Sequence, residues 1–412
     1  MPRLVRSGAL TLALALLAAG AAAAAGTLTI TCIDVGQGDA TLIQSPSGRT
    51  LLFDGGENGR GTSIVVPFLH AAGVDTLDWI VASHYHSDHI GGLDEVMSAI
   101  PVRYAVYDRG GSYTTATYNS YVAAAGAKRT TLAVGQVIDM GEGVTVTAIN
   151  MNGAGVLPAP YTNSTYENEY DVCLKVEYGG FDFVQAGDLT GDPSSGSKDI
   201  ETTMSALVGD VDVYQVNHHG SYTSSTAAWL SATQPEVSVI SVGDGNSYGH
   251  PHQVVLDRLQ AFSSFVYQTE TGSGGTLPAS DLRVVHGHVV IATDGGATYT
   301  VAGDVWQTDE NNQSPAPDQL PAALVLMGNH PNPFNPSTEI RFESARTGAG
   351  SLRIVDVAGR LVHDEPLAVL TGINAVRWDG RDAQGRSVPA GVYLYQVTVP
   401  GGAAAGRMVL VK

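Results

Sequence analysis

The sequence predicts an α/β (α+β) protein, in which a mixed domain of strands and helices precedes a smaller all-β domain. Strand-like and helix-like segments alternate from Leu28 to Val242. A polar segment from Thr308 to Asp318 follows, and the strand-like runs beyond it are separated by glycines. We therefore expect one domain at 27–305, a linker at 306–318 and a second domain at 319–412.

The N-terminus has the pattern of an export signal. Arg3 and Arg6 precede an apolar run at 9–19, and an alanine run continues to Ala25. This pattern is typical of a cleaved signal peptide, which we expect at 1–25. A transmembrane anchor is the alternative, but the apolar run is shorter than the roughly 20 residues of a comfortable span. The signal predicts a secreted or cell-surface protein with no membrane span after cleavage.

The elements of the first domain follow from local patterns. Thr62 can cap a helix that runs to Leu69, and Pro67 should kink or shorten that helix. Gly91 and Gly92 begin the next helix. Residues 150–170 are rich in Asn, Gly, Pro, Thr and Tyr and predict a loop. Apolar periodicity and turn residues predict strands at 28–33, 40–43, 50–53, 77–82, 172–178, 181–185, 211–216 and 238–242.

Residues that bind metals or substrates follow the ends of four of these strands. The segment from His84 to His89, with the pattern H-x-H-x-D-H, comes after the strand at 77–82. Asp188 follows 181–185 and His218 follows 211–216, while Asn246 and His250 come after 238–242. Loops at the ends of scaffold strands commonly carry the chemistry of a fold.

The H-x-H-x-D-H segment predicts a site for two divalent ions. Imidazole and carboxylate groups suit zinc and similar first-row ions. In an extended turn, alternate residues point the same way, so His84 and His86 can bind one ion. Asp88 and His89 then face the second ion. We expect zinc, with manganese as the alternative. A histidine-rich surface loop is the structural alternative.

These motifs resemble those of the metallo-β-lactamase superfamily, whose fold is an αββα sandwich. The upstream motifs D-V-G-Q-G-D at 34–39 and D-G-G at 54–56 resemble its competence-protein ComEC branch, as do H-H-G-S at 218–221 and Y-G-H-P at 248–251. The resemblance runs from about Leu28 to Asp304. It implies that Asp188 bridges both metals and that Asp54 buttresses the histidine loop.

The resemblance implies a secreted phosphodiesterase or nuclease that attacks with a hydroxide held by two metals. Nucleic acid or another phosphodiester is then the substrate. An acyl hydrolase of the lactonase or β-lactamase type is the alternative, since the same metal core serves both reactions. A non-catalytic surface protein is a third interpretation, although such a protein has no need for six ligand-type residues.

The remaining site residues are expected to bind metal, donate a proton, line the cleft or bind the substrate. We expect His218 to complete the second metal site, with His219 as the alternative, and the unbound histidine to donate a proton to the leaving group. Asp88 also orients the attacking hydroxide. Asp34, Gln37 and Asp39 line the cleft behind the ligands or serve the turn alone. Ser221, Asn246 and His250 are the expected substrate-binding residues.

One ligand is missing from the pattern. The superfamily usually supplies a third histidine to the first metal, but this chain has no histidine between His89 and His218. Water, substrate or an oxygen ligand from the segment 167–171 must complete that site. A site richer in oxygen should tolerate manganese and bind its metal more weakly.

Charge separates the two domains. Residues 27–318 contain 10 Lys and Arg against 33 Asp and Glu, a net charge of −23, whereas residues 319–412 contain 9 and 7. An acidic domain repels polyanions at long range, which counts against passive nucleic-acid binding. It does not exclude a nuclease, because bound metals place positive charge at the scissile phosphate.

The second domain resembles FlgD-like immunoglobulin modules and the C-terminal sorting domains of type IX secretion cargo. The motifs are P-N-P-F-N-P-S-T at 331–338, V-R-W-D-G-R-D at 376–382 and V-P-A-G-V-Y at 388–393. An ordinary β-sandwich is the structural alternative. The resemblance implies a small immunoglobulin-like sandwich, a secretion machinery as partner, and export through the periplasm of a Gram-negative-type bacterium.

Overall fold

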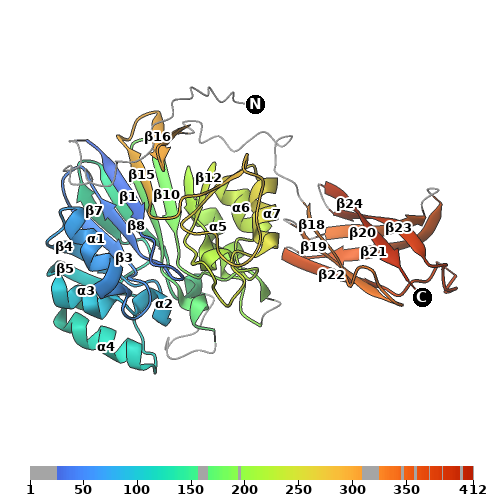
Figure 1. The fold of residues 1–412 in the computed structure, drawn as a ribbon, viewed down its shortest axis with the longest axis horizontal. Coiled ribbons are helices and arrows are strands. Elements are labelled where there is room, and N and C mark those ends of the chain that lie inside the picture. Colours follow the sequence, from blue (N-terminus) through green and yellow to red (C-terminus); the bar gives the residue numbers. More distant parts are fainter. Residues whose placement is uncertain are drawn as a thin grey trace.

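The chain folds into an αββα sandwich followed by an all-β sandwich, which confirms the predicted fold class (Figure 1). The computed structural model describes residues 26–155, 166–193, 196–308, 324–344, 348–356, 360–370, 372–382, 384–399 and 402–411. The expected signal at 1–25 and most of the expected linker lie outside these residues. Within the described ranges, no helix is both long and apolar enough to cross a membrane.

The first domain contains two mixed sheets. In the nine-stranded sheet, the strands β3, β4, β5 and β6 are parallel to one another, and the other neighbouring pairs are antiparallel. Its order is β17 (Asp304–Gln307), β16 (Thr298–Val301), β15 (Val289–Thr293), β1 (Leu28–Cys32), β2 (Thr41–Gln44), β3 (Thr50–Phe53), β4 (Leu77–Val81), β5 (Val102–Asp108) and β6 (Arg129–Thr131).

The second sheet has eight strands, of which the run from β10 to β14 is parallel. The strands β7 to β10 pair antiparallel. Its order is β14 (Leu282–Val284), β13 (Phe265–Gln268), β12 (Val237–Ile240), β11 (Val213–Gln215), β10 (Phe181–Gln185), β9 (Cys173–Tyr178), β8 (Val144–Asn150) and β7 (Val137–Gly141).

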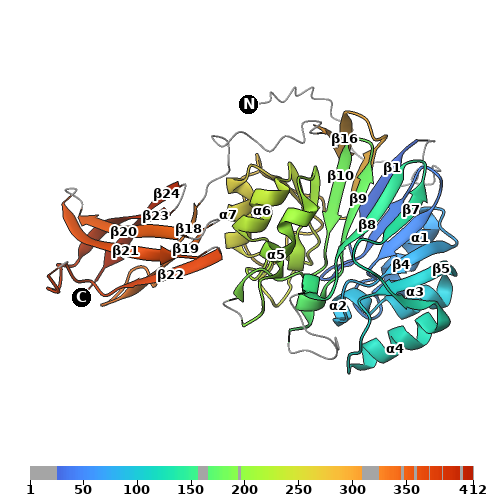
Figure 2. The same ribbon diagram turned by 180° about the vertical axis from the view of Figure 1, so that it is seen from behind.

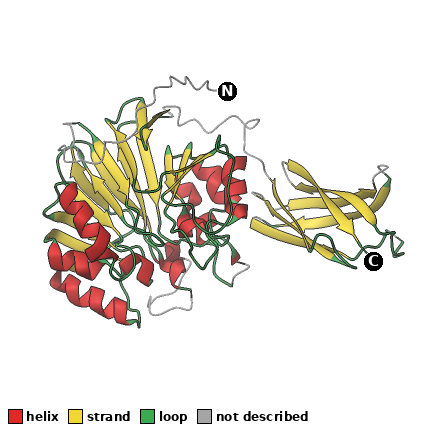
Figure 3. Cartoon of the chain, viewed as in Figure 1, coloured by secondary structure: helices red, strands yellow, loops and turns green. Residues whose placement is uncertain are grey.

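Alternation along the strands produces the layers, because neighbouring side chains point to opposite faces. In β3, Leu51 and Phe53 join the core between the sheets, and Leu52 packs against helices on the outside. In β10, Phe183 joins the central core and Val184 the outer one. Figures 2 and 3 show helices on both outer faces. They are α1 (Val66–Ala71), α2 (Ser87–Ile90), α3 (Leu93–Ala99) and α4 (Ala116–Ala125) on the first sheet, and α5 (Ile200–Val208), α6 (Ala227–Thr233) and α7 (Gln253–Ala261) on the second.

The helix predicted from Thr62 forms in two pieces. A π-helical turn at Gly61–Val65 leads directly into α1, and Pro67 lies in the first turn of α1. Proline has no N–H to donate, and the first turn of an α-helix has no acceptor for that group. The proline therefore marks the point where regular α-helix begins.

The second domain consists of two antiparallel sheets around their own core. The core includes Phe334, Ile354, Trp378, Tyr395 and Met408, all buried. The sheets are β18 (Leu324–His330), β19 (Thr338–Ser344) and β22 (Gly372–Trp378), and β21 (Leu361–Val369), β20 (Gly348–Asp356), β23 (Gly391–Val399) and β24 (Gly402–Leu410).

Candidate metal centre

Loops that follow strands of both sheets meet in one cleft. The segment after β4 carries His84 and His86 and continues into α2, which contains Asp88 and His89. The turn after β10 carries Asp188, the 3₁₀ turn Asn217–Gly220 after β11 carries His218 and His219, and His250 follows β12. Eight residues from four separate segments therefore converge at the carboxyl ends of four strands.

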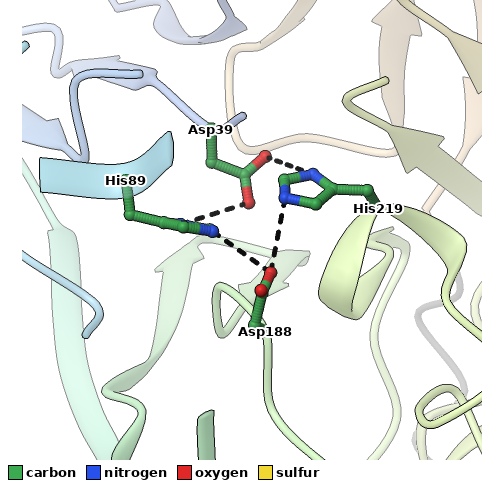
Figure 4. Close-up of side chains that lie close together, drawn as sticks. All are labelled: Asp39, His89, Asp188 and His219. Carbon is green, nitrogen blue, oxygen red and sulfur yellow. Dashed lines mark ion pairs between the residues drawn. The ribbon is translucent and has the colours of Figure 1, made fainter. Parts of the chain in front are cut away.

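Asp88, His89, Asp188 and His219 form what we name the His219 cluster. His89 Nε2 lies 3.2 Å from Asp188 Oδ1 and 3.9 Å from Asp88 Oδ2. His219 Nε2 lies 3.4 and 3.5 Å from the same two oxygens. Tetrahedral ligand atoms at zinc distances of about 2.0–2.2 Å stand about 3.3–3.6 Å apart. These four nitrogen–oxygen distances are close to that spacing, so the two Nε2 atoms can share one metal ion with carboxylate oxygens. Figure 4 shows both imidazoles directed at Asp188, together with Asp39, which completes a second possible four-residue metal-binding group with His89, Asp188 and His219.

Several atoms of this cluster are buried without a hydrogen-bond partner. Within the described part of the chain, His89 Nε2, His219 Nε2 and Asp188 Oδ1 all have this property. A buried polar atom left without a partner costs about 1–3 kcal/mol or more. A divalent cation in the middle of the cluster would satisfy all three atoms, so the residues fit a metal ion.

His84, His86 and Asp188 form the second group, which we name the His84 cluster. His84 Nε2 lies 3.0 Å from His86 Nδ1 and 3.8 Å from Asp188 Oδ2. The two carboxylate oxygens of Asp188 thus face different clusters, Oδ1 the His219 cluster and Oδ2 the His84 cluster. This arrangement is that of a carboxylate shared by two metal sites.

The segment expected to supply an oxygen ligand brings one residue to this place. Asn168 Nδ2 lies 3.2 Å from Asp188 Oδ2, and the Asn168 amide oxygen is buried without a partner. Glu167 is instead held by Arg109 at 2.7 and 2.8 Å, and Glu169 accepts from Lys198 N. Asn168 is therefore the residue of this segment whose side-chain amide lies beside the Asp188 oxygen that faces the His84 cluster.

Carboxylates behind the histidines fix their ring orientation. Asp54 Oδ2 lies 2.9 Å from His89 Nδ1, and Asp54 Oδ1 accepts from Ser83 N. Asp171 Oδ1 lies 3.0 Å from His84 Nδ1. Such partners hold the Nε2 lone pair toward the metal. Asp171 belongs to the segment 167–171 that was expected to supply an oxygen ligand, but its carboxylate lies on the Nδ1 side of His84.

The three polar residues of the D-V-G-Q-G-D turn, Asp34, Gln37 and Asp39, have different surroundings. Asp39 is buried, accepts from Gln215 at 2.9 Å, and lies 3.8 and 3.9 Å from the Nδ1 atoms of His89 and His219. Gln37 lines the cleft. Asp34 turns away, since its Oδ1 accepts from Gly36 N and its own N–H bonds to His288.

The turn also supports the ligands through its backbone. Asp39 N donates to the carbonyl oxygen of Asp88 at 3.1 Å. Gly38 has φ +130, and an added Cβ there would collide with that same oxygen. The glycine is therefore required for the turn to pack against the ligand-bearing helix α2.

His218 and His219 both have left-handed backbone, with φ of 54° and 53°, and their side chains point to different places. His219 joins the His219 cluster, and its Nδ1 lies 3.0 Å from Ser241 O. His218 is instead outside that cluster, with Nε2 3.4 Å from Asp188 Oδ2 and Nδ1 3.0 Å from Thr223 Oγ1. The structure therefore places His219 within the His219 cluster, and it places His218, the ligand expected from the sequence, beside Asp188 Oδ2 outside that cluster.

Hydrogen bonds to Glu201 stabilise the turn that carries His218 and His219. Its carboxylate accepts from Asn217 Nδ2, Ser225 N and Thr226 N at 2.8, 2.6 and 2.8 Å. Burial raises the pKa of Glu201 to about 7, against these three hydrogen bonds, which favour the charged form. No sequence signal distinguishes Glu201 from an ordinary helical glutamate.

The cleft above the clusters has a volume of about 560 Å³. His250 lines it, as expected of a substrate-binding residue, but Ser221 and Asn246 are not among its lining residues. Ser221 Oγ is turned toward Thr223 Oγ1, and Asn246 Nδ2 donates to Gly243 O and His250 O. Both side chains hold their loops in shape instead of facing the cleft.

Charge in the His219 cluster is arranged for a cation. Burial lowers the pKa of His219, but Asp39, Asp188 and Asp88 outweigh burial and raise it to about 9. Asp188 likewise keeps the pKa of His89 well above its usual value despite burial. Burial raises the pKa of Asp188, yet His218, His89 and His219 hold it well below the usual range. Ionised carboxylates thus attract positive charge, which protons supply until a metal replaces them.

Several known proteins are similar to this chain in sequence or in structure. ComE operon protein 3 of Bacillus subtilis (strain 168) is 29% identical over 254 residues, covering 58% of this chain and 31% of that protein. Competence protein ComA of Neisseria gonorrhoeae is 31% identical over 270 residues, covering 62% and 34%. The chain spans about a third of the length of these curated relatives. Among solved structures, the metallo-beta-lactamase fold protein YhfI from Bacillus subtilis matches with a TM-score of 0.37 and 12% identity, over 60% of this chain and 98% of that one.

Two family models match the chain. The FlgD Ig-like domain matches residues 329–402, which lie in the second sandwich. The Metallo-beta-lactamase superfamily matches residues 33–244, just over half of the chain, and this range contains both clusters. The chain therefore belongs to the metallo-beta-lactamase superfamily, as a metal-dependent hydrolase.

Proposed function

We propose that the chain is a secreted phosphodiesterase or nuclease that uses two divalent ions. The observation that carries the proposal is Asp188, whose two oxygens face the two ligand clusters. Support for a phosphodiester comes from the names of the relatives, which include competence proteins and the Recombination protein 2 of Haemophilus influenzae, 29% identical over 244 residues, 58% of this chain and 27% of that protein.

The residues of the two clusters would hold two different ions. His84, His86 and Asp188 would hold one ion, and Asp88, His89, His219 and Asp188 the other. Divalent ions held by these residues would supply Lewis-acid chemistry, namely activation of water and stabilisation of charge on the phosphate oxygens. Asp88, whose side chain is 24% exposed, reaches the cleft and orients the attacking water.

His218 is the proposed donor to the leaving oxygen. Its side chain is 23% exposed in the cleft, and its Nε2 lies beside Asp188 Oδ2. Thr223 bonds Nδ1, which directs the other nitrogen toward the substrate. A proton or hydrogen bond supplied at that position assists departure of the alkoxide.

The C-terminal sandwich is proposed to direct export. Its FlgD-like motifs resemble the sorting domains of type IX secretion cargo, and the cleft-lining residues all lie between Gln37 and His250. The domain therefore supplies location, and the first domain supplies chemistry.

The test is a substrate panel on metal-loaded protein: single-stranded DNA, RNA, bis(p-nitrophenyl) phosphate, nitrocefin and lactones. We expect phosphodiester cleavage, and we expect Asp88→Ala to abolish it while the circular dichroism spectrum is unchanged. Wild-type rates in Asp88→Ala would refute the mechanism. Cleavage of nitrocefin or a lactone, with no phosphodiester cleaved, would establish the acyl-hydrolase alternative.

A further inference from the structure

We propose that Tyr248 is a stacking platform for a nucleobase beside the scissile phosphate, so that the cleft recognises one or two nucleotides and does not follow a charged backbone. The inference rests on the proposed phosphodiesterase function. It adds the class of substrate and the residue that selects it.

Tyr248 has the geometry of such a platform. Its side chain lies in the loop between β12 and α7, lines the cleft, and is 64% exposed. Its ring stacks on His250 with 5.5 Å between centroids and 20° between planes. The His250 ring in turn lies 5.6 Å from that of His218 and 6.1 Å from that of His219. An exposed aromatic face is thus held, by a supporting ring, close to the ligand clusters.

A second tyrosine, which lies between His89 and Asp188 in the sequence, also lines the cleft. Tyr113, from the loop between β5 and α4, lines the same cleft with its ring 6.1 Å from that of His86. Both clusters therefore have a tyrosine within reach. Aromatic side chains stack on any base, because every base presents a π-face.

The cleft lacks the groups that grip a polyanion. Its lining residues include no Lys or Arg among those that the structure describes. The residues 156–165 and 194–195 contain none in their sequence either. The nearby Arg109 is fully buried in its ion pair with Glu167. Proteins that follow a nucleic-acid backbone do so with Lys and Arg. Stacking contributes about 1–3 kcal/mol per base and needs no positive charge.

Binding of a nucleotide tests the platform without turnover. We would titrate the manganese-loaded full chain with thymidine 5′-monophosphate, and with deoxyribose 5-phosphate, by calorimetry. Tyr248→Ala should bind the nucleotide about 5- to 150-fold more weakly, the factor that corresponds to 1–3 kcal/mol. Tyr248→Phe should bind within twofold of wild type, and deoxyribose 5-phosphate should bind both forms alike.

Tyr222→Ala is the matched control, because Tyr222 is also an exposed tyrosine, at 44%, beside a histidine, but does not line the cleft. It should leave nucleotide binding unchanged. Equal binding by wild type and Tyr248→Ala would overturn the platform, whether or not phosphodiesters are cleaved. If the protein cleaves no phosphodiester but still binds the nucleotide in a way that depends on Tyr248, only the proposed function is overturned.

Salt dependence tests the second half of the inference. Between 50 and 200 mM salt, a protein with 6–10 phosphate contacts loses about 10³- to 10⁵-fold in affinity. We expect KM for a single strand of about 30 nucleotides to change less than about tenfold over this range and to stay close to KM for a dinucleotide. A steep loss restricted to the long strand would contradict recognition of one or two nucleotides.

Discussion

At the scale of residues, two adjacent histidines illustrate how backbone conformation assigns chemistry. His218 and His219 both adopt left-handed backbone, which a non-glycine residue rarely does without support. The result is that His219 Nε2 faces Asp88 and Asp188, while His218 Nε2 lies at the cleft surface. The pair therefore divides between metal binding and substrate contact in the proposed site.

The first prediction separates these two roles. His218→Ala should retain two ions per chain and lose about 10²- to 10⁴-fold in kcat, the usual contribution of a positioned proton donor. His219→Ala should lose one ion, because it removes one of the four ligand atoms of its cluster. Metal content by mass spectrometry and steady-state kinetics provide both readouts. Loss of an ion from His218→Ala would make His218 a ligand.

The second prediction concerns the unequal clusters. The His84 cluster offers two nitrogens and Asp188, with the side-chain amide of Asn168 nearby, whereas the His219 cluster offers two nitrogens and two carboxylates. Because the His84 cluster has fewer charged ligands, it should bind its ion more weakly than the His219 cluster does. Dialysis should remove one ion readily, and manganese should restore activity at least as well as zinc. Two ions that resist dialysis equally, with activity from zinc alone, would exclude this difference.

At the scale of elements, the sequence predicted the strands before the site better than the side-chain directions within it. The carboxyl ends of β4, β10 and β11 could be predicted, because both the apolar alternation and the order of the motifs mark them. The contacts of Asp171, Asn168 and Glu201 could not be predicted, since each reaches across the fold. The sequence indicated only that the segment 167–171 could supply an oxygen ligand. Ser221 and Asn246 were placed in the cleft by motif alone, and hydrogen bonds within their own loops direct them elsewhere.

Arg109 and Glu167 make the same point about tertiary contacts. Their buried pair, with Arg109 also 4.1 Å from the Tyr85 ring, holds the 3₁₀ turn at Glu167–Tyr170 under the cleft. Removal of one partner from such a pair costs about 3–5 kcal/mol. Neither residue stands near the other in sequence, so only the fold reveals the pair.

The third prediction uses Glu201, which links α5 to the histidine turn. Its pKa is raised from 4.5 to about 7, so the folded state binds its proton more tightly than the unfolded state. The free energy of unfolding should therefore fall as pH rises from about 4.5 to 7, by on the order of 3 kcal/mol from this group. Glu201→Gln should show a flatter curve in urea unfolding over that range. Parallel curves for the two proteins would rule out the assignment.

At the scale of the whole molecule, the two domains differ in charge and in contribution to the cleft. The first domain is strongly acidic, and the residues that line the cleft all belong to it. The second domain has its own buried core around Trp378 and Ile354. Domains with separate cores joined by a polar linker usually fold independently.

The fourth prediction follows from this division. A chain truncated after residue 318 should keep kcat/KM within about threefold of the full chain, while its export or surface attachment in the native host should be lost. Activity of the purified forms and fractionation of the host give the two measurements. A truncated protein that folds, reaches the same location and loses activity would reverse the proposed roles.

The central claim is that Asp188 joins two metal sites, one through each carboxylate oxygen. Metal content after reconstitution of the full chain tests it directly, with wild type, Asp188→Ala and, as the matched control, His86→Ala, which alters only the His84 cluster. We predict two ions in wild type, one in His86→Ala, and a loss from both sites in Asp188→Ala. Two ions retained by a folded Asp188→Ala protein would contradict the account.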